Sequence, residues 1–255
     1  MNLIDTHTHL YSEEFARDIE VVMKRAEQKG VQKFYLPAID GTTHQQMIAL
    51  EEQYPGKCIP MMGLHPCYVK ENYISELQVV EDWLAKRKFV AIGEIGLDFY
   101  WDKTFTAQQY LAFRKQIEWS LHYKLPIVIH TRNAMPETIA IVKEYVAQGV
   151  KGIFHCFSGN AADAAEIIDM GFYLGIGGVI TYKNAGLAEV IEKIDLQHLV
   201  LETDAPYLTP VPFRGKRNES SYLGYIVEKL ALVKNVPVEE VAAITTANAE
   251  KIFGL

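Results

Sequence analysis

Short apolar runs alternate along the chain with longer segments in which apolar residues recur every three or four positions. The short runs are typical of buried strands, and the longer segments are typical of amphipathic helices. Eight strands are expected: the first opens at Leu3 and Ile4 and carries His7 and His9, and the others lie at residues 34–36, 58–64, 89–95, 126–130, 152–155, 172–176 and 199–202. Helices are expected from Ser12 to Gly30, over 42–53, around 77–84, from a Thr106–Gln109 capping box through Leu121, over 136–148, from an Asn160 cap to Gly171, over 187–194, over 222–234 and from Pro237 onward.

Strands that are separated by helices pair in parallel, and eight such units in one chain predict an α/β fold. The fold class is a single (β/α)8 TIM barrel spanning residues 1–255 as one domain. No stretch is rich enough in Pro, Gly or Ser to form an interdomain linker. The polar, basic segment 206–221 follows the last strand, and we expect it to be a long loop at the active site.

Composition agrees with a large globular domain, since 49% of the 255 residues are hydrophobic and 22% are charged. The net charge of −7 disfavours a protein that coats a nucleic-acid duplex, but it does not argue against a local basic rim. No apolar run is long enough to cross a membrane, and the N-terminal residues lack a basic region followed by an apolar stretch. Three unevenly spaced cysteines, without a CxxC pair, fit a reducing cytoplasm.

The candidate chemistry lies where the predicted strands end. Five of the eight histidines fall at these ends, together with three acids; the set is His7, His9, His65, Glu94, His130, His155, Glu202 and Asp204. The C-terminal ends of the strands build the active site of such barrels, so a metal site is expected there. His7 and His9 are two apart on a strand and should share one face, with Asp5 in the same row. His44, His122 and His198 are interpreted as surface or packing residues.

This set of imidazoles and carboxylates exceeds the needs of one tetrahedral ion and fits two divalent ions. The expected assignment is His7, His9 and Asp204 on one ion, His130 and His155 on the other, and Glu94 as the bridge. Two ions about 4 Å apart would activate a water and stabilise both the attacking and the leaving oxygens of a displacement. Asp204 is also placed to act as the general base, so Asp204 and Glu94 are the expected catalytic residues. Zn, Mg and Mn are all candidates for the metal.

Six motifs in order resemble the TatD-type deoxyribonucleases, metal-dependent barrels related to the amidohydrolases. They are DTHTH at 5–9, GLHP at 63–66, GEIGLD at 93–98, VIH at 128–130, HCFSG at 155–159 and LETDAP at 201–206. The resemblance implies a divalent-metal-dependent hydrolase of DNA phosphodiesters. It carries the metal ligands onto His7, His9, Glu94, His130, His155 and Asp204. Cys67 and Ser220 depart from the family pattern in loops that face substrate, so they bear on substrate preference.

Further residues are candidates for contacts with the substrate. Arg132, Arg214 and Arg217 lie in loops after the fifth and eighth strands, and a guanidinium matches phosphate bidentately. His65 is expected to contact the substrate or leaving group, with a structural role as the alternative. Glu202 is expected either to orient a metal ligand or to touch the substrate.

The loop after the fourth strand offers a further candidate. Asp98 is expected to hold this loop. Its aromatics, residues 99–101, either stack on nucleobases or pack under the following helix.

The sequence is compatible with three functions. The first is a two-metal deoxyribonuclease, exonuclease-like, acting on single-stranded or terminal nucleotides, with DNA as substrate and neither a membrane nor an obligate protein partner. The second is an amidohydrolase-like enzyme for a carboxylic ester, lactone or amide, because two metals polarise a carbonyl as readily as a phosphoryl group. The third is a non-enzymatic metal-binding barrel, against which the intact ligand set and Asp204 argue.

Overall fold

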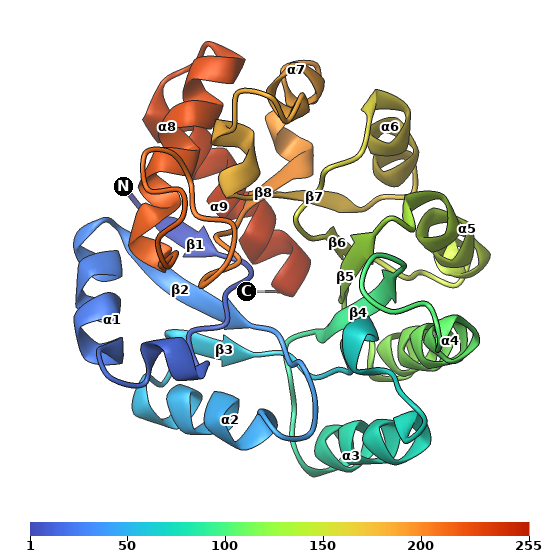
Figure 1. Cartoon of the computed structure of the whole chain (residues 1–255). Coiled ribbons are helices and arrows are strands. Elements are labelled where there is room, and N and C mark those ends of the chain that lie inside the picture. Colours follow the sequence, from blue (N-terminus) through green and yellow to red (C-terminus); the bar gives the residue numbers. More distant parts are fainter. Residues whose placement is uncertain (255) are drawn as a thin grey trace.

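The computed structural model describes residues 1–254, in which strands and helices alternate around a central axis (Figure 1). The strands are β1 (Leu3–Asp5), β2 (Val31–Leu36), β3 (Cys58–Pro60), β4 (Ile92–Asp98), β5 (Ile127–Arg132), β6 (Gly152–Phe154), β7 (Tyr173–Ile176) and β8 (Leu199–Leu201). The helices are α1 (Ile19–Gln28), α2 (His44–Gln53), α3 (Tyr73–Lys86), α4 (Thr106–Tyr123), α5 (Met135–Val146), α6 (Ala161–Asp169), α7 (Leu187–Ile191), α8 (Leu223–Lys234) and α9 (Val238–Phe253).

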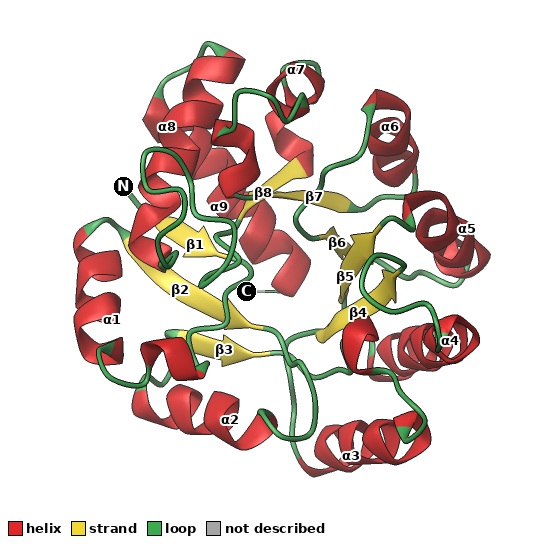
Figure 2. Ribbon diagram, in the orientation of Figure 1, coloured by secondary structure: helices red, strands yellow, loops and turns green. Residues whose placement is uncertain are grey.

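The strands pair in parallel, in the order β1-β2-β3 and β4-β5-β6-β7-β8. A parallel bridge between Met62 and Ile92 joins the two groups. At the other seam the Thr6 amide donates to the Leu201 carbonyl over 3.0 Å. The strands therefore form a ring, with helices α1 to α8 around its outside (Figure 2). The predicted (β/α)8 barrel is confirmed.

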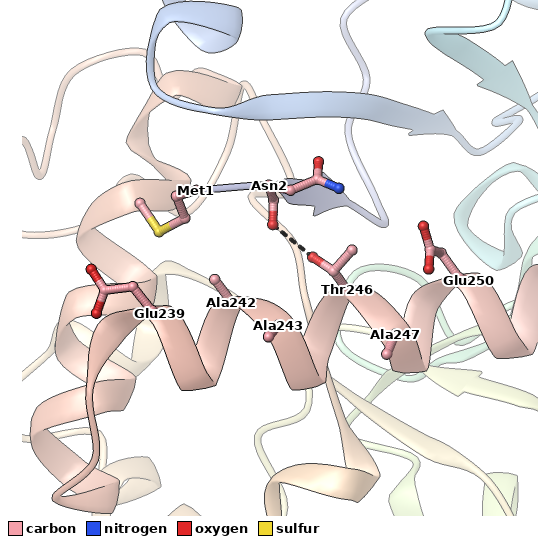
Figure 3. Close-up of a pocket in the computed structure, with 8 residues that line it drawn as sticks. All are labelled: Met1, Asn2, Glu239, Ala242, Ala243, Thr246, Ala247 and Glu250. Carbon is pink, nitrogen blue, oxygen red and sulfur yellow. Dashed lines mark hydrogen bonds between the residues drawn. The ribbon is translucent and has the colours of Figure 1, made fainter.

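The interior of the barrel is filled by apolar side chains on the side where α9 packs against it. The layer consists of Ile4, Tyr35, Met61, Ala91, Val128, Ile153 and Val200 from the barrel, with Ala249, Ile252 and Phe253 from α9. The rings of Tyr35 and Phe253 stack with centroids 3.9 Å apart. Beside this layer, Met1 and Asn2 lie along α9 over a shallow groove, where Thr246 donates to the Asn2 carbonyl (Figure 3). Reactive polar groups therefore have room only at the opposite end of the barrel.

Two predicted helix caps are wrong. Ser12 makes no capping bond; a 3-10 turn at Glu13–Phe15 precedes α1, which begins after Asp18. The predicted Thr106–Gln109 capping box is absent from α4, because the Gln109 amide instead pairs with the backbone N–H and carbonyl of Asp98. The Asn160 cap on α6 is confirmed.

The predicted fourth strand is displaced by three residues, since β4 runs over Ile92–Asp98. Every residue of β4 is buried, so the strand lacks the polar alternation that would mark its ends. Only glycine fits at position 96 of this strand. Its φ is +145°, and a Cβ there would lie 1.9 Å from the His130 carbonyl oxygen.

Across residues 1–254, no helix combines the length and the apolar character that a membrane crossing requires. The three cysteines, Cys58, Cys67 and Cys156, are free thiols.

Candidate metal centre

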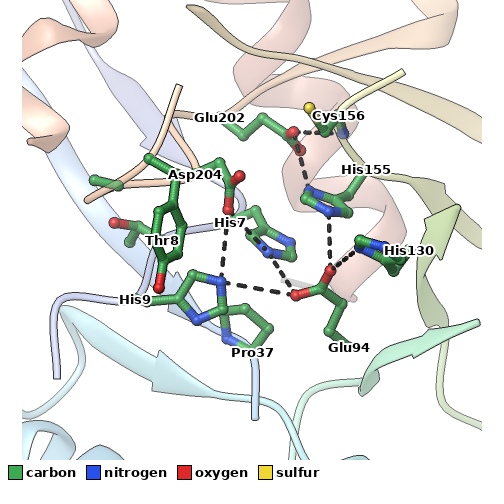
Figure 4. A network of polar contacts seen from close by, with 12 residues as sticks. His7, Thr8, His9, Pro37, Glu94, His130, His155, Cys156, Glu202 and Asp204 are labelled. Atoms are coloured by element: carbon green, nitrogen blue, oxygen red, sulfur yellow. Dashed lines mark hydrogen bonds and ion pairs between the residues drawn. The ribbon is translucent and has the colours of Figure 1, made fainter. Parts of the chain in front are cut away.

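Glu94 of β4 lies at the centre of the polar cluster and turns its two oxygens toward different histidines (Figure 4). Its Oε2 lies 3.1 Å from Nε2 of His7 and 3.7 Å from Nε2 of His9. Its Oε1 lies 2.9 Å from Nδ1 of His130, 3.0 Å from Nε2 of His155 and 3.3 Å from Nε2 of His65. One oxygen for each group of nitrogens is the arrangement of a carboxylate that bridges two cations.

Asp204 completes the first of these groups. Its Oδ1 lies 3.7 Å from Nε2 of His7 and 3.5 Å from Nε2 of His9. Donor atoms that lie close enough together to share an ion are supplied by His7, His9 and Glu94, and equally by Glu94, His130 and His155. The residues predicted as ligands are thus brought together by the fold. His7, His155 and Asp204 also lie close enough together to share an ion, so the clusters overlap, and the assignment of each residue to one of two ions stays a prediction.

The support of His7 and His9 differs from the prediction, because β1 ends at Asp5 and the two histidines lie beyond it. The extended backbone is held by neighbouring strand ends instead: Thr8 N–H donates to the Tyr35 carbonyl, and His9 N–H donates to the Ala205 carbonyl. Asp5 does not point into the cluster. Its carboxylate accepts hydrogen bonds from the hydroxyls of Thr203 and Ser220, and burial raises its pKa to about 7.

The outer ring nitrogens of two histidines are fixed by carboxylates. Nδ1 of His155 lies 3.2 Å from Oε1 of Glu202, and Nε2 of His130 lies 2.8 Å from Oδ2 of Asp98. An ionised carboxylate only accepts hydrogen bonds, so each of these nitrogens carries its proton. In the neutral rings that metal binding requires, the inner nitrogens, Nε2 of His155 and Nδ1 of His130, then hold the lone pair of a metal ligand.

The ring of His9 is oriented by the hydroxyl of Tyr11 in the same way. Tyr11 donates its hydroxyl proton to the Pro37 carbonyl over 2.6 Å, so its oxygen accepts from Nδ1 of His9 at 3.1 Å. This leaves the Nε2 lone pair of His9 facing Glu94 and Asp204.

His7 provides an independent test of whether the residues fit a cation. It is 0% exposed, and neither ring nitrogen makes a well-directed hydrogen bond in the described part of the chain, although Nε2 lies 3.1 Å from Oε2 of Glu94. Its ring stacks on that of His155 with centroids 3.7 Å apart. Buried polar atoms without partners are costly and call for an explanation. A divalent cation between His7, Asp204 and Glu94 would supply the missing partner, so the donor set fits.

The electrostatics of the cluster also favour a cation. Burial raises the pKa of Glu94, but His155, His65 and His7 outweigh it and hold that pKa well below the usual range. Burial likewise opposes the ionisation of Asp204, and contacts with His9, His155 and His7 still lower its pKa. For His155, burial is outweighed by Glu94 and Glu202, which raise its pKa. The carboxylates stay ionised and attract positive charge.

His65 differs from the four histidines predicted as ligands in the state of the nitrogen that faces the site. Its Nδ1 accepts a hydrogen bond from the Cys67 amide over 3.1 Å, so in the neutral ring Nε2 carries the proton. Burial lowers the pKa of His65, which favours this neutral form. The ring therefore presents a hydrogen-bond donor to the site rather than a lone pair.

Two of the predicted substrate contacts lie elsewhere. Glu202 is 0% exposed and bonds His155 and the Cys156 amide, a geometry that supports the first of its two predicted roles, the orientation of a metal ligand. Arg217 forms a bidentate ion pair with Asp18 at 2.6 and 2.9 Å and lies over the ring of Phe15. The fold uses Arg217 to hold the loop before α8 against α1.

Arg132 and Arg214 are exposed on the strand-end face. Arg132 lies over the ring of Tyr100, and Arg214 lies 4.1 Å from the ring centroid of Tyr182. Of the histidines predicted to lie away from the site, His44 is buried against Trp83 and His122 is exposed, as expected.

The sequence reasoning missed two supporting residues. Asp98 holds its loop as predicted, but it also bonds His130. Tyr11 orients His9. Asp98 had a detectable signal, because it is four residues from Glu94 on one strand, a spacing that places side chains on the same face. Tyr11 lies in a turn after His9, so no strand period reveals its contact.

Comparisons with known proteins agree with this geometry. The family model described as TatD related DNase matches residues 4–254. The uncharacterised metal-dependent hydrolase YabD of Bacillus subtilis is 41% identical over 252 residues, 98% of each chain. The 3'-5' ssDNA/RNA exonuclease TatD of Erwinia amylovora is 32% identical over 259 residues, 99% of this chain and 100% of that one. The crystal structure of YjjV, a TatD homologue from Escherichia coli, superposes with a TM-score of 0.93 at 30% identity, covering 99% and 98% of the two chains.

Proposed function

Because the chain belongs to the TatD-related DNase family of metal-dependent hydrolases, we propose that it hydrolyses phosphodiester bonds of single-stranded or terminal nucleotides in DNA. The observation that carries the proposal is the placement of Glu94 between two groups of inward-facing histidine nitrogens. The exonuclease named among the relatives supports a nucleic-acid substrate. A cytoplasmic location and a single domain over residues 1–255 are part of the proposal.

Two divalent ions, Zn, Mg or Mn, are proposed to bind here. His7, His9 and Asp204 would hold one, His130 and His155 the other, and Glu94 would bridge them. Bound ions of this kind lower the pKa of a water and neutralise charge that develops on a phosphoryl group.

The protein's own residues supply the proton transfer. The side chain of Asp204 is 14% exposed, the largest exposure recorded among the acids that contact the site histidines, so water reaches it. Its lowered pKa keeps it ionised at neutral pH, as a base that takes a proton from the attacking water must be. His65, with its proton on Nε2, would donate a hydrogen bond to a phosphate oxygen or to the leaving group.

Arg132 and Arg214 are proposed to attract the phosphate backbone. Both are exposed at the strand-end face: Arg132 is the last residue of β5, and Arg214 lies in the loop that follows β8. Guanidinium groups bind phosphate bidentately, and local positive charge at the site is compatible with a net charge of −7 for the whole chain.

The test is cleavage of end-labelled single-stranded DNA by protein that has been stripped of metal and reloaded with Mg, Mn or Zn. Wild-type protein should cleave only after reloading, and Glu94→Gln should lose cleavage because the bridge loses its charge. Glu239→Gln, an exposed glutamate at the start of α9, is the matched control and should retain full activity.

Metal-loaded wild-type protein that leaves DNA intact would refute the nuclease. The same protein would then be assayed with carboxylic esters, lactones and amides, since the ligand set is equally suited to a carbonyl group.

A further inference from the structure

The exposed aromatic side chains of this protein share one location. Within residues 1–254, four aromatic residues are more than a third exposed: Tyr68, Tyr100, Trp101 and Tyr207. All four follow the C-terminal end of a strand, namely β3, β4 and β8. The large exposed aliphatic residues on the helices, such as Leu111 and Leu232, are single side chains that need no explanation, whereas the exposed aromatic residues gather in the strand-end loops near the candidate metal centre.

All three loops are connected to histidines of the candidate metal centre. The ring of Tyr68 lies edge-on to His65 with centroids 6.0 Å apart, and that of Tyr207 lies edge-on to His9 at 6.1 Å. The exposed pair Tyr100 and Trp101 is connected to His130 through Asp98.

Asp98 ties the exposed pair rigidly to the metal ligands. Its Oδ1 accepts hydrogen bonds from the backbone amides of Tyr100 and Trp101 at 2.9 and 3.1 Å. Its Oδ2 bonds Nε2 of His130. One buried carboxylate therefore sets the position of both the aromatic loop and a histidine of the centre. Phe99, the third aromatic of this loop, packs inward beside Tyr110. Of the two predicted alternatives, packing under the following helix therefore applies to Phe99, and the exposed Tyr100 and Trp101 remain available for stacking.

Arg132 packs against both exposed rings, Tyr100 and Trp101. Its guanidinium lies 3.9 Å from the ring centroid of Tyr100 and 5.2 Å from that of Trp101, and the two rings meet edge-on at 4.9 Å. Trp101 is 67% exposed, so its indole has open surface left after these contacts. Indole faces and guanidinium planes are the surfaces on which unpaired nucleobases stack.

We propose that Trp101, supported by Tyr100 and Arg132, is the stacking site for an unpaired nucleobase of a nucleotide that adjoins the scissile phosphate. This inference rests on the proposed function and adds its substrate-positioning residues. A base paired and stacked within a duplex cannot lie on Trp101, so the site selects single-stranded or frayed ends. Stacking tolerates every base, so little sequence preference is expected.

The experiment combines substitutions at Trp101 with removal of the base from the substrate. Single-stranded oligo(dT) is compared with oligonucleotides that carry an abasic residue at one of the last three positions. The proteins are wild type, Trp101→Ala, Trp101→Phe and the control Leu232→Ala, which removes an equally exposed apolar side chain from α8. Circular dichroism and metal content verify that each variant folds and loads.

A stacked base contributes a factor of about 10 to 100. Trp101→Ala should lower kcat/KM on oligo(dT) by about that factor, mainly through KM, while Trp101→Phe retains most activity and Leu232→Ala retains all. Wild type should lose a similar factor when one particular base is missing, and Trp101→Ala should lose almost nothing further on that abasic substrate. Additive losses, or a Trp101→Ala variant equal to wild type, would overturn the inference while leaving the nuclease intact.

If metal-loaded wild type cleaves no oligonucleotide, the proposed function fails separately. Fluorescence anisotropy of labelled oligo(dT) and its abasic analogues with wild type and Trp101→Ala then decides the inference. Weaker binding that depends on both the base and Trp101 would support it, and equal binding by the two proteins would refute it.

Discussion

Glu202→Gln is expected to weaken metal binding without disturbing the fold. In the wild-type protein, Oε1 of Glu202 accepts from His155 and from the Cys156 amide, while Oε2 has no hydrogen-bond partner within residues 1–254. Glutamine has the same shape and keeps one oxygen for both donors. The change therefore removes the negative charge behind His155 and little else.

The size of the effect follows from that hydrogen bond. A bond to a charged group contributes about 1.5–3 kcal/mol, and a bond to a neutral acceptor is roughly half as strong. The loss at His155 is then about 0.8–1.5 kcal/mol, which corresponds to an affinity for metal about 4-fold to 13-fold weaker. Substitutions at such outer positions weaken metal binding by about 10-fold to 100-fold in other proteins, so we expect about 10-fold.

The assay is competition for Zn between the protein and a chromophoric chelator, for wild type, Glu202→Gln and the exposed control Glu239→Gln. Glu202→Gln should bind the more weakly held ion about 10-fold less tightly, and excess metal should restore most of the activity that the variant loses. An affinity within twofold of wild type would refute the reasoning, because it would mean that the Glu202 charge does not set the basicity of His155.

Three further outcomes are expected. Gly175→Ala should reduce both metal affinity and Tm, because its Cβ would lie 2.2 Å from Oε2 of Glu202; unchanged metal affinity would contradict this. Arg25→Met should lower the free energy of unfolding at pH 7 by about 1–3 kcal/mol, since it leaves the buried Glu219 carboxylate without its ion pair. Arg25 lowers the pKa of Glu219 against the opposing effect of burial, so the deficit should shrink as the pH falls below 4.5, and a deficit that persists to pH 3 in urea unfolding would contradict this. Chelation of the loaded protein should lower Tm by about 5–10 °C in calorimetry, because an ion at 100 times its Kd contributes about 2.7 kcal/mol; an unchanged Tm would show that folding and metal binding are not coupled.

Several features of the barrel were accessible from the sequence because they depend on local repetition. Apolar periodicity identified the alternation of strands and helices, and parallel pairing follows from that alternation. Asn160 illustrates a local signal that sufficed, since its cap involves only residues of the same turn. Gln109 illustrates the opposite case: its amide serves the Asp98 backbone, a partner that no local pattern reveals.

The candidate ligands were accessible for a related reason. A barrel brings all strand ends to one face, so polar residues at those ends must meet whatever their separation along the chain. Arg217 shows the limit of this reasoning. It lies in the loop expected at the active site, but Asp18 near the start of α1 is close enough to bind it, and only the folded chain decides between the two.

By itself the sequence determined the kind of fold and the types of donor atom at the centre, because both depend on residue type and spacing. Tertiary structure decided which oxygen of Glu94 faces which histidines, which nitrogen of each ring carries the proton, and which aromatics stay exposed. These properties depend on the distances and angles between side chains that are far apart along the chain. Glu202 is 47 residues from His155, and their contact exists only once β6 and β8 have taken their places in the barrel.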